Sequence, residues 1–443
     1  MFSCHARWVS NLPGPVANLT FSQLQHRPRH LFAYENRALS LPNVLYLVHR
    51  VPFPPDKGDR IRAYHVLAHL AKRATVWLAC LADEPVSDEN VASLRGLTQR
   101  LAIVPTQPWR RWPRALLSFL RGRTISEGAF ASGSLSGVLA EWAHLTKFHA
   151  SLASSSSLAP YLRLPALRDI PSVVDLVDVD SQKWFDYAAS TRGPRSWLFR
   201  AEGRRLRCLE RDLPSWAVAG TVVSQVEAEV FHSIRAWDGL HVLPNGVDLR
   251  YFRPCSSPRD EKGCVFVGAL DYYPNVDAAC WFCREIWPEI YRRFPEAHLQ
   301  LVGRRPVAAV RKLAEVKGVQ VVGPVADVRP YLSKAAVALA PLRIARGLQN
   351  KVLEALAMAK ATVASPQALA GFSEDADLPV VRASSPAEWI ELVVHLLGDA
   401  DLRHERGEAG RRYVESHHEW DRCLAPLNGL LDLPSKSTNL VAC

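Results

Sequence analysis

Short runs of continuous apolar residues alternate with amphipathic helical stretches along most of this chain. Runs such as VLYLV at 44–48 and CVFVGAL at 264–270 predict strands that are buried on both faces of a helix-covered parallel sheet. The alternation forms two series, which are separated near 244–262 by the turn-forming residues Pro244, Gly246, Pro254 and Pro258. Because 443 residues are too many for one ordinary core, we expect an α/β protein with two doubly wound, Rossmann-like domains in tandem.

Each series predicts its own set of elements. The first predicts strands at 44–48, 75–81, 100–105, 148–154, 172–178, 221–225 and 240–246, with helices at 59–73 and 88–100. The second predicts strands at 264–270, 298–303, 319–325, 335–342 and 361–365, with helices at 276–294, 306–317, 350–359, 386–398, 401–415 and 419–431. Ligands bind at the carboxyl ends of the strands in such sheets, so two domains of this kind that face each other would enclose a binding cleft.

The segments outside the two series differ in composition. Residues 1–42 show no clear period and contain several Pro, so we expect a flexible N-terminal extension or a start of translation placed too early. An organelle-targeting peptide is the lesser alternative. We expect an N-terminal extension at 1–42, a first Rossmann-like domain at 43–243 and a second at 244–415. A C-terminal helix at 416–433, which could cross back to the first domain, and a tail at 434–443 would follow.

The composition is that of a globular protein with excess positive charge. Charged residues make up 22% of the chain, and 54 Lys and Arg against 44 Asp and Glu give a net charge of +10. This charge favours an anionic partner, but no recognition motif for nucleic acid accompanies it. The nine Cys have no spacing typical of a disulfide framework, and no apolar run approaches the roughly 20 residues of a bilayer span. We therefore expect a cytoplasmic protein.

The segment 341–365 carries the clearest indication of a binding site. A predicted strand ends at Leu342, a Gly-containing loop follows, and a helix begins near Asn350. Free N–H groups at a helix start attract anions, and Lys351 adds a cation where it opposes the helix dipole. A diphosphate ligand would explain this cation, and Glu354, one turn further on, could accept both ribose hydroxyls of a nucleotide. The alternative is an ordinary solvated helix start.

The same segment, APLRIARGLQNKVLEALAMAKATVASP, resembles the donor-binding signature of family 4 glycosyltransferases, which are retaining enzymes of the GT-B fold. Lys351 and Glu354 match the family's Lys-x-x-Glu pattern before a short strand. The resemblance implies that these two residues bind a nucleotide diphosphate sugar, with Gly347 and Asn350 beside them. It also implies that the nucleotide diphosphate sugar is a substrate and that the reaction needs no metal and no other cofactor.

The segment departs from the family at informative positions. The family's first Glu falls at Arg346, and Arg cannot accept a hydrogen bond. The usual Gly and Pro after the helix are replaced by Ala359 and Ala361. We expect Arg343 and Arg346 to strengthen a diphosphate cradle instead, and we count Arg346 and Lys351 among the candidate catalytic residues.

Further segments extend the resemblance over about 43–433. NGVDLRYFRP at 245–254 is similar to the family's interdomain segment. FVGALDYYPNVDA at 266–278 is similar to the first loop of its nucleotide-binding domain, which implies that Gly268 lies against the diphosphate and that Asn275 is a helix N-cap at the donor site.

The opening segment VHRVPFPPDKGDRIRAYHVLAHLAKRATV resembles the first strand, Gly-rich loop and helix of the family. This implies an acceptor side that includes His49, Lys57, Gly58 and Asp59. Several segments are similar in sequence to the sugar transferases associated with PEP-CTERM/exosortase exopolysaccharide clusters in bacteria. The implied function is transfer of a sugar to a saccharide or lipid-linked acceptor in exopolysaccharide biosynthesis. A non-catalytic GT-B scaffold that binds a nucleotide sugar, and a nucleotide-sugar epimerase, remain alternatives.

Asp178 and Asp180 form a DxD string after an apolar strand. In a different glycosyltransferase fold, GT-A, such a pair holds Mn²⁺ or Mg²⁺, but a GT-A chain would not have two α/β series. With a GT-B fold, either carboxylate could orient the acceptor hydroxyl or accept its proton, which makes both candidate catalytic residues. The alternative is that they cap the next helix.

Two basic stretches concentrate the positive charge. WRRWPRALLSFLRGR at 109–123 has five Arg, two Trp and no acidic residue, and RGPRSWLFRAEGRRLRCLER at 192–211 has seven Arg. Basic amphipathic segments with Trp are typical of proteins that bind an anionic membrane surface. A solvated helix face is the alternative for each stretch. If the first interpretation holds, the protein is peripheral on the inner face of the cytoplasmic membrane.

Overall fold

The computed structural model describes residues 41–56, 58–106, 108–254, 260–372 and 378–434. Residues 41, 42 and 434 apart, the expected N-terminal extension and C-terminal tail lie outside these ranges.

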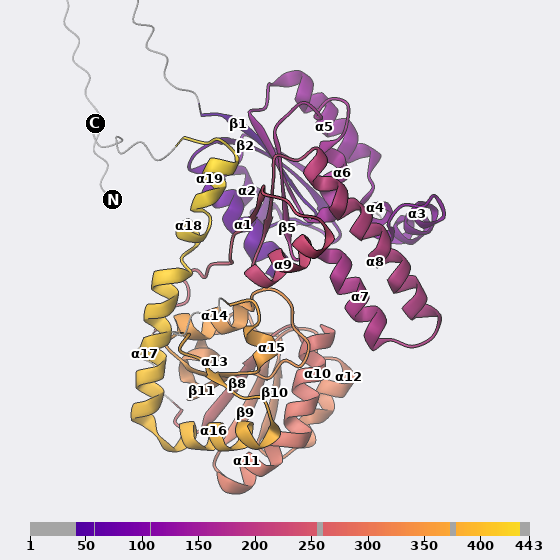
Figure 1. Cartoon of the computed structure of the whole chain (residues 1–443). Coiled ribbons are helices and arrows are strands. Elements are labelled where there is room, and N and C mark those ends of the chain that lie inside the picture. The colour runs from indigo at the N-terminus through magenta and orange to yellow at the C-terminus, as the bar shows by residue number, and fades with distance from the viewer. Residues whose placement is uncertain (1–40, 57, 107, 255–259, 373–377, 435–443) are drawn as a thin grey trace, which may run out of the picture. The chain divides into compact units, whose positions relative to one another are not determined.

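The first domain is built on a seven-stranded, all-parallel sheet in the order β3-β2-β1-β4-β5-β6-β7 (Figure 1). Its strands are β1 (Asn43–Val48), β2 (Thr75–Ala82), β3 (Arg100–Pro105), β4 (Ala150–Ser154), β5 (Ser172–Val177), β6 (Ala219–Val222) and β7 (Leu240–Val242). Its helices are α1 (Gly58–Ala71), α2 (Asp88–Arg95), α3 (Pro108–Leu120), α4 (Ile125–Phe130), α5 (Gly133–Leu145), α6 (Ala159–Leu162), α7 (Asp180–Ser190), α8 (Pro194–Asp212) and α9 (Gln225–Ile234), with short 3-10 turns at Ser156–Leu158 and Leu213–Ser215.

The second domain contains a six-stranded parallel sheet in the order β10-β9-β8-β11-β12-β13. Its strands are β8 (Gly263–Val267), β9 (His298–Val302), β10 (Val319–Gly323), β11 (Val337–Ala340), β12 (Ala361–Ala364) and β13 (Val381–Arg382). Its helices are α10 (Tyr273–Trp281), a π-helical turn (Phe282–Ile286), α11 (Trp287–Arg293), α12 (Ala308–Arg311), a 3-10 turn (Lys312–Glu315), α13 (Arg329–Lys334), α14 (Asn350–Ala357), α15 (Pro366–Leu369), α16 (Pro386–Gly398) and α17 (Ala400–His417).

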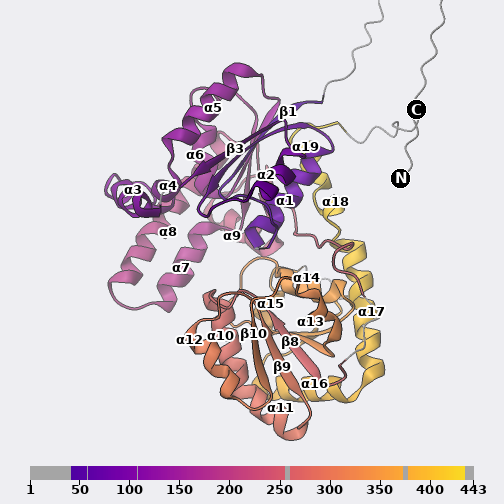
Figure 2. The ribbon, with the colours of Figure 1, turned by 180° about the vertical axis from the view of Figure 1, so that it is seen from behind.

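Helices cover both faces of each sheet, as the opposite views in Figures 1 and 2 show. Buried strand residues such as Leu45 and Leu47 pack toward α5 and α9, whereas their neighbours Val44 and Tyr46 pack toward α1. Alternate residues of one apolar strand thus enter two different cores, which explains why the strands show no polar alternation. The predicted α/β class and the two Rossmann-like sheets are confirmed.

The strand order reverses between β1 and β4 in the first sheet and between β8 and β11 in the second. At such a switch point the loops after the two central strands diverge, and ligands bind between them. The candidate donor-binding residues lie in the loops that follow β8 and β11 and in the helices α10 and α14 that those loops lead into. His49 lies in the loop after β1, and Asp59 lies in the first turn of α1.

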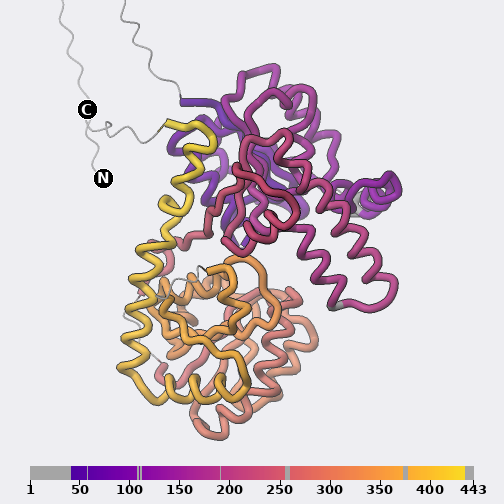
Figure 3. The backbone as a smooth tube through the Cα atoms, viewed as in Figure 1, coloured from indigo at the N-terminus to yellow at the C-terminus, as the bar shows by residue number. Residues whose placement is uncertain are grey.

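The last described helices pack on the first domain. After α17, the helices α18 (Trp420–Cys423) and α19 (Ala425–Leu430) run beside α1 (Figure 3). His69 Nε2 lies 3.0 Å from Asn428 Oδ1, and Lys72 Nζ lies 2.8 Å from Asp421 Oδ2. Leu424 is fully buried in the same core as Tyr46.

Several expected elements have different bounds. The strand expected at 221–225 ends at Val222, because Ser224 instead caps α9 and accepts a hydrogen bond from Glu227 N. The helix expected at 276–294 is divided into α10, the π-helical turn and α11, and the one expected at 306–317 is reduced to α12 and a 3-10 turn. The helix expected at 419–431 is two short helices, α18 and α19.

Candidate active site

The loop after β11 leads into α14, which begins at Asn350 as the sequence predicts. Gly347 has a φ of 60°, a left-handed conformation that glycine adopts without strain. The N-cap residue Gln349 provides no side-chain cap for the helix, because its amide donates to Arg346 O at 2.9 Å instead. The first N–H groups of α14 thus lack a side-chain partner from their N-cap, as an anion-binding helix start requires.

Lys351 reaches from α14 to the carboxyl end of β8. Its Nζ donates to Asn275 Oδ1 at 2.5 Å and lies 4.8 Å from the ring centroid of Phe266. A Cβ atom on Gly268 would lie 3.2 Å from this Nζ and 2.9 Å from Asn275 Nδ2. The backbone at Gly268 can therefore approach the amine only because it has no side chain.

Burial perturbs both charged groups of α14. It lowers the pKa of Lys351 to about 8, although the charge of Glu354 opposes the shift. It raises the pKa of Glu354 to about 7, against the effect of Lys351. Among the described residues, none donates a hydrogen bond to the Glu354 carboxylate, so both of its oxygens can accept bonds from a ligand.

The expectation that Asn275 is a helix N-cap is wrong. The N-cap of α10 is Tyr272, and Asn275 lies in the first turn. The Asn275 amide bridges two other groups: Nδ2 donates to Ala269 O at 2.9 Å, and Oδ1 accepts from Lys351. Asn275 therefore fixes the loop after β8 and the Lys351 amine relative to each other.

The two arginines of the loop are paired with carboxylates of the protein. Arg343 binds Asp277 of α10 through two nitrogens, with Nε at 2.9 Å. Arg346 binds Asp186 at 2.7 Å and Glu227 at 2.9 Å, both in the first domain. Each guanidinium charge is thus matched inside the protein, and the expected diphosphate cradle stays a prediction.

Asp178 lies directly opposite Gly347. A Cβ atom on Gly347 would be 2.3 Å from Asp178 Oδ1, a buried oxygen without a hydrogen-bond partner. The preceding residue, Val177, has a φ of 67°, which is strained for a β-branched side chain and turns the chain sharply at the end of β5. Burial, together with the charges of Glu227 and Asp180, raises the pKa of Asp178 to about 7.

Comparisons with known proteins find likenesses in the second domain and in the fold of the whole described chain. Residues 261–399, from the start of the second sheet to the end of α16, match the family model described as glycosyl transferases group 1. The chain carries a glycosyltransferase domain. This matched segment contains Gly268, Asn275, Lys351 and Glu354. No curated protein sequence matches the chain.

Solved structures resemble both domains together. Sucrose-phosphate synthase from Thermosynechococcus elongatus has a TM-score of 0.65 at 15% identity, over 88% of this chain and 98% of that one. HepE from Anabaena, in complex with UDP, has a TM-score of 0.62 at 12% identity, over 88% and 99%. TarM from S. aureus has a TM-score of 0.64 at 8% identity, over 89% and 99%. At these identities the likeness establishes the fold, which is GT-B.

Asp180 does not cap the helix that follows it. The N-cap of α7 is Val179, which provides no side-chain cap, and Asp180 is the first helical residue. Its Oδ2 accepts from Ser156 Oγ at 2.5 Å, so the carboxylate is held by the turn after β4. Among the described residues, no group of three or more His, Cys, Asp or Glu is arranged to hold a metal ion.

Three buried glutamates that accept hydrogen bonds from backbone N–H groups at helix starts were not predicted. Glu227 accepts from Val179 N at 2.8 Å, Glu210 from Ser181 N at 2.9 Å, and Glu202 from Ile125 N at 2.6 Å. Each carboxylate caps backbone N–H groups at a helix start that is far from it in sequence. A signal existed, because Glu202 and Glu210 lie eight residues apart on one face of the Arg-rich helix α8, where an acidic pair is unexpected.

The acceptor-side candidates of the glycosyltransferase lie after β1. His49 Nε2 is 3.4 Å from Asp59 Oδ2, and Arg50 Nη1 is 2.9 Å from the same oxygen. Burial alone would raise the pKa of Asp59, but the hydrogen bond from His49 and the charge of Arg50 hold it well below its usual range. A Cβ atom on Gly58 would lie 3.8 Å from Asn350 Nδ2, which brings the start of α1 close to the start of α14. Lys57 lies outside the described residues.

Proposed function

We propose that this protein is a retaining glycosyltransferase that transfers a sugar from a nucleotide diphosphate sugar to a saccharide or lipid-linked acceptor, in bacterial exopolysaccharide biosynthesis. The observation that carries the proposal is the cluster of Lys351, Glu354, Asn275 and Gly268 around the start of α14, inside the segment that matches glycosyl transferases group 1. HepE, which shares the fold, has been crystallised with UDP and with UDP-glucose.

The donor diphosphate would lie against the start of α14 and the Lys351 amine. A pKa of about 8 leaves most of this amine charged near neutral pH, and partial burial strengthens its interaction with an anion. Glu354 would accept the two ribose hydroxyls. Negative charge grows on the diphosphate as the sugar leaves, so its stabilisation by Lys351 and the helix N–H groups supplies the main catalytic effect. The proposed reaction uses no metal.

Asp178 would act on the acceptor. Its carboxylate has a pKa near 7, an oxygen free of protein partners, and a position across from the donor loop at Gly347. A group with these properties can accept a proton from an attacking hydroxyl near neutral pH. Asp180, which is bound to Ser156, would hold the turn in place.

Nucleotide binding tests the donor site. Calorimetry with UDP, GDP, ADP and dTDP should identify one nucleoside diphosphate that the wild-type protein prefers. We expect Glu354→Ala to weaken this binding by about tenfold or more, because it removes hydrogen bonds to a charged acceptor. Glu405→Ala, an exposed position on α17, is the matched control and should bind like the wild type. Equal affinity in wild type and Glu354→Ala would refute the assignment.

Turnover assays with the nucleotide sugar of the preferred nucleoside diphosphate separate the alternatives. The pairing of Arg346 with Asp186 and Glu227, at the position of the family's first Glu, favours a scaffold that binds a nucleotide sugar without turnover as the second candidate. Donor binding without hydrolysis or transfer to any lipid-linked acceptor would support this scaffold. Conversion of the donor sugar in the absence of acceptor would indicate an epimerase.

Peripheral membrane binding is the second part of the proposal. On α3, Trp112 and Leu120 are each 74% exposed, and Trp197 of α8 is 64% exposed. Phe119 joins the two helices, because its ring contacts Trp197 edge-on and lies 3.8 Å below the guanidinium carbon of Arg205. The two basic stretches therefore form one surface of aromatic and cationic side chains, which suits anionic headgroups. No described helix has the length and apolar character needed to span a bilayer.

Vesicle co-sedimentation tests this surface. We expect binding to vesicles of phosphatidylglycerol and phosphatidylcholine that decreases with salt, and none to phosphatidylcholine alone. Trp112→Ser and Leu120→Ser should reduce the bound fraction, whereas Leu145→Ser, at an apolar site on α5 that is 56% exposed, should not. Equal binding to both kinds of vesicle, or none to either, would leave α3 and α8 as ordinary solvated surface.

A further inference from the structure

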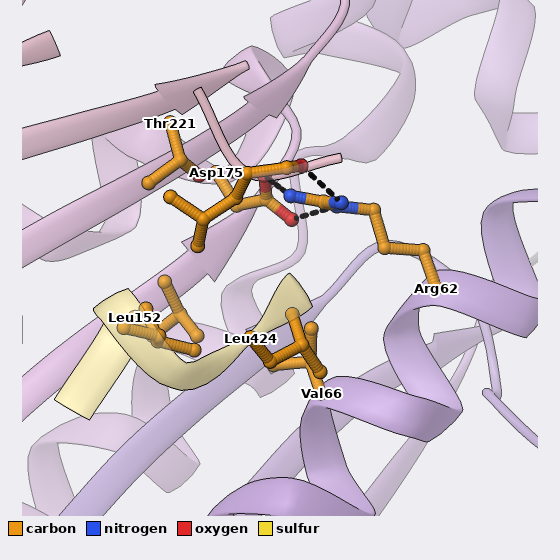
Figure 4. A pocket seen from close by; sticks show the side chains of 8 residues that line it. Arg62, Val66, Leu152, Asp175, Thr221 and Leu424 are labelled. Carbon is orange, nitrogen blue, oxygen red and sulfur yellow. Dashed lines mark hydrogen bonds and ion pairs between the residues drawn. The ribbon is translucent and has the colours of Figure 1, made fainter. Parts of the chain in front are cut away.

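A buried ion pair holds the segment that connects the two domains. Arg62 of α1 is 2% exposed and binds both oxygens of Asp175 on β5, at 2.8 and 2.9 Å (Figure 4). Thr221 of β6 donates to the same carboxylate at 2.7 Å. The remaining nitrogen of Arg62, Nη1, donates to Leu243 O at 2.9 Å and to Asn245 Oδ1 at 3.0 Å. The guanidinium therefore fixes the start of the interdomain segment to the core of the first domain.

Asn245 in turn contacts the start of α14, the helix of the proposed donor site. Its Nδ2 donates to Asn350 Oδ1 at 3.1 Å, and its backbone oxygen lies 2.9 Å from His418 Nδ1. The orientation of the Asn245 amide is unambiguous, because Arg62 can only donate and must therefore face the oxygen. The amide nitrogen then faces Asn350, which must present its own oxygen. The result is a continuous series of hydrogen bonds: Arg62 donates to Asp175 and to Asn245, and Asn245 donates to Asn350.

The end of this chain lies at the proposed diphosphate site. Asn350 is the first residue of α14, and Lys351 follows it. The helix start has no side-chain cap from Gln349, so the bond from Asn245 is a lateral restraint on the first turn. Removal of the Asn245 amide would leave a buried Arg62 donor and the Asn350 oxygen without partners, and the first turn would lose a fixed orientation.

We propose that Asn245 is a positioning residue, which sets the affinity of the site for a diphosphate by orienting the first turn of α14 from the core of the first domain. The inference rests on the proposed donor-binding function of α14. Asn245 itself would not contact the donor. Its effect would pass through Asn350, so the two side chains should act as one unit.

A double-mutant cycle on Asn245 and Asn350 tests this. The readout is the dissociation constant of the nucleoside diphosphate, among UDP, GDP, ADP and dTDP, that binds wild type most tightly. We expect Asn245→Ala to weaken binding by about three- to tenfold, the effect of one lost hydrogen bond. Asn350→Ala should weaken it by at least as much, and the double variant should bind like Asn350→Ala, because the shared interaction is removed only once.

Two further variants separate positioning from general destabilisation. Asn245→Asp still accepts from Arg62, and a rotated Asn350 amide can donate to its second oxygen, so this variant should restore most of the affinity. Asn90→Ala on α2 is the matched control. Urea unfolding of every variant shows which ones are folded in the assay.

The outcomes distinguish the inference from the function on which it rests. Wild-type affinity in folded Asn245→Ala, or additive effects of the two Ala variants, would overturn the positioning role and leave the donor site intact. A wild-type protein that binds none of the four nucleoside diphosphates would overturn both. If Asn245→Ala does not fold, affinity in Asn245→Asp as low as in Asn350→Ala would overturn the positioning role.

Discussion

Individual residues at the candidate site are held in states that cost stability. Asp178 has a buried oxygen without a hydrogen-bond partner, and its neighbour Val177 has a strained backbone conformation. Asp178 also lies so close to Gly347 that no side chain would fit at position 347. Lys351 and Glu354 each have a pKa displaced toward the neutral form. Groups of this kind are found where a ligand or a reaction uses them, because packing alone would select apolar or neutral side chains.

Replacement of Asp178 by Asn should stabilise the protein. The pKa of Asp178 is about 7 in the folded state, above the ordinary value of 3.8, so the folded state binds its proton more tightly than the unfolded state. The stability of the wild type therefore falls as the pH rises from about 4 through 7. Asn lacks this loss, and we expect a gain of about 1–2 kcal/mol at pH 8.

Urea unfolding at pH 5.5 and pH 8 measures this effect. The difference between Asp178→Asn and wild type should be larger at pH 8. The variant should also lose sugar transfer, while its nucleotide affinity stays unchanged. A variant that is less stable than wild type at pH 8 would show that the carboxylate has partners in solution.

Diphosphate binding should weaken in alkaline solution. The charged amine of Lys351 binds the anion, and its lowered pKa means that the free protein loses this charge as the pH rises through about 8. Between pH 7.5 and 9 the dissociation constant should rise by up to about tenfold, the limit set by a single proton. Lys351→Arg keeps its charge and should show no such rise in calorimetry. A rise of equal size in both proteins would assign the titration to another group.

At the scale of elements, the strands could be predicted almost completely and the helices only in part. Apolar runs located the strands of six or more residues within one residue. The shorter strands β7 and β8 end earlier than expected, and β13 has only two residues and gives no such pattern. Helices break where the chain lacks a donor: Pro288 stands in the first turn of α11 and Pro426 in that of α19. Between 105 and 148 the sequence indicated a helix only as an alternative, at 109–123, although α3, α4 and α5 lie there.

The candidate site shows the same limit. The start of α14 and its Lys351–Glu354 pair could be found from the sequence, because they depend on neighbours within one turn. The sequence could not predict that Arg346 pairs with Glu227, or that Glu202 and Glu210 cap distant helices, since these interactions join residues far apart in the chain. Long-range partners of charged groups are set by tertiary packing, which leaves little trace in local pattern.

The cap on α4 offers a test at this scale. Glu202 is buried and accepts from Ile125 N, Ser126 N and Ser126 Oγ, between 2.6 and 2.9 Å. Glu202→Ala should lower the free energy of unfolding by about 2–4 kcal/mol, because it leaves these donors without a partner. Glu202→Gln keeps one acceptor oxygen and should fall between. Urea unfolding of the three proteins checks the order, and equal stability of Gln and Ala would show that the cap contributes nothing beyond packing.

For the whole molecule, the last helices belong to the first domain. Leu424 has no exposed surface and lies in the core that contains Tyr46 and Val66. Leu424→Ala should cost about 2–5 kcal/mol, as other buried Leu→Ala changes do, and the loss should appear in the first domain. Hydrogen exchange should show reduced protection in β1 and α1 but little change in β8 and β9. Equal loss of protection in both sheets would show that the domains unfold as one unit.

The packing of α18 and α19 on the first sheet also bears on biosynthesis. A ribosome releases residues 43–243 first, and α1 covers part of one face of their sheet. The core on this face is completed by Trp420, Leu424, Leu427 and Leu431, which emerge only after the second domain. The early half therefore leaves the exit tunnel with part of this apolar core uncovered until α18 and α19 follow. Because nascent chains with exposed apolar surface associate readily, this protein should depend on chaperones during most of its synthesis.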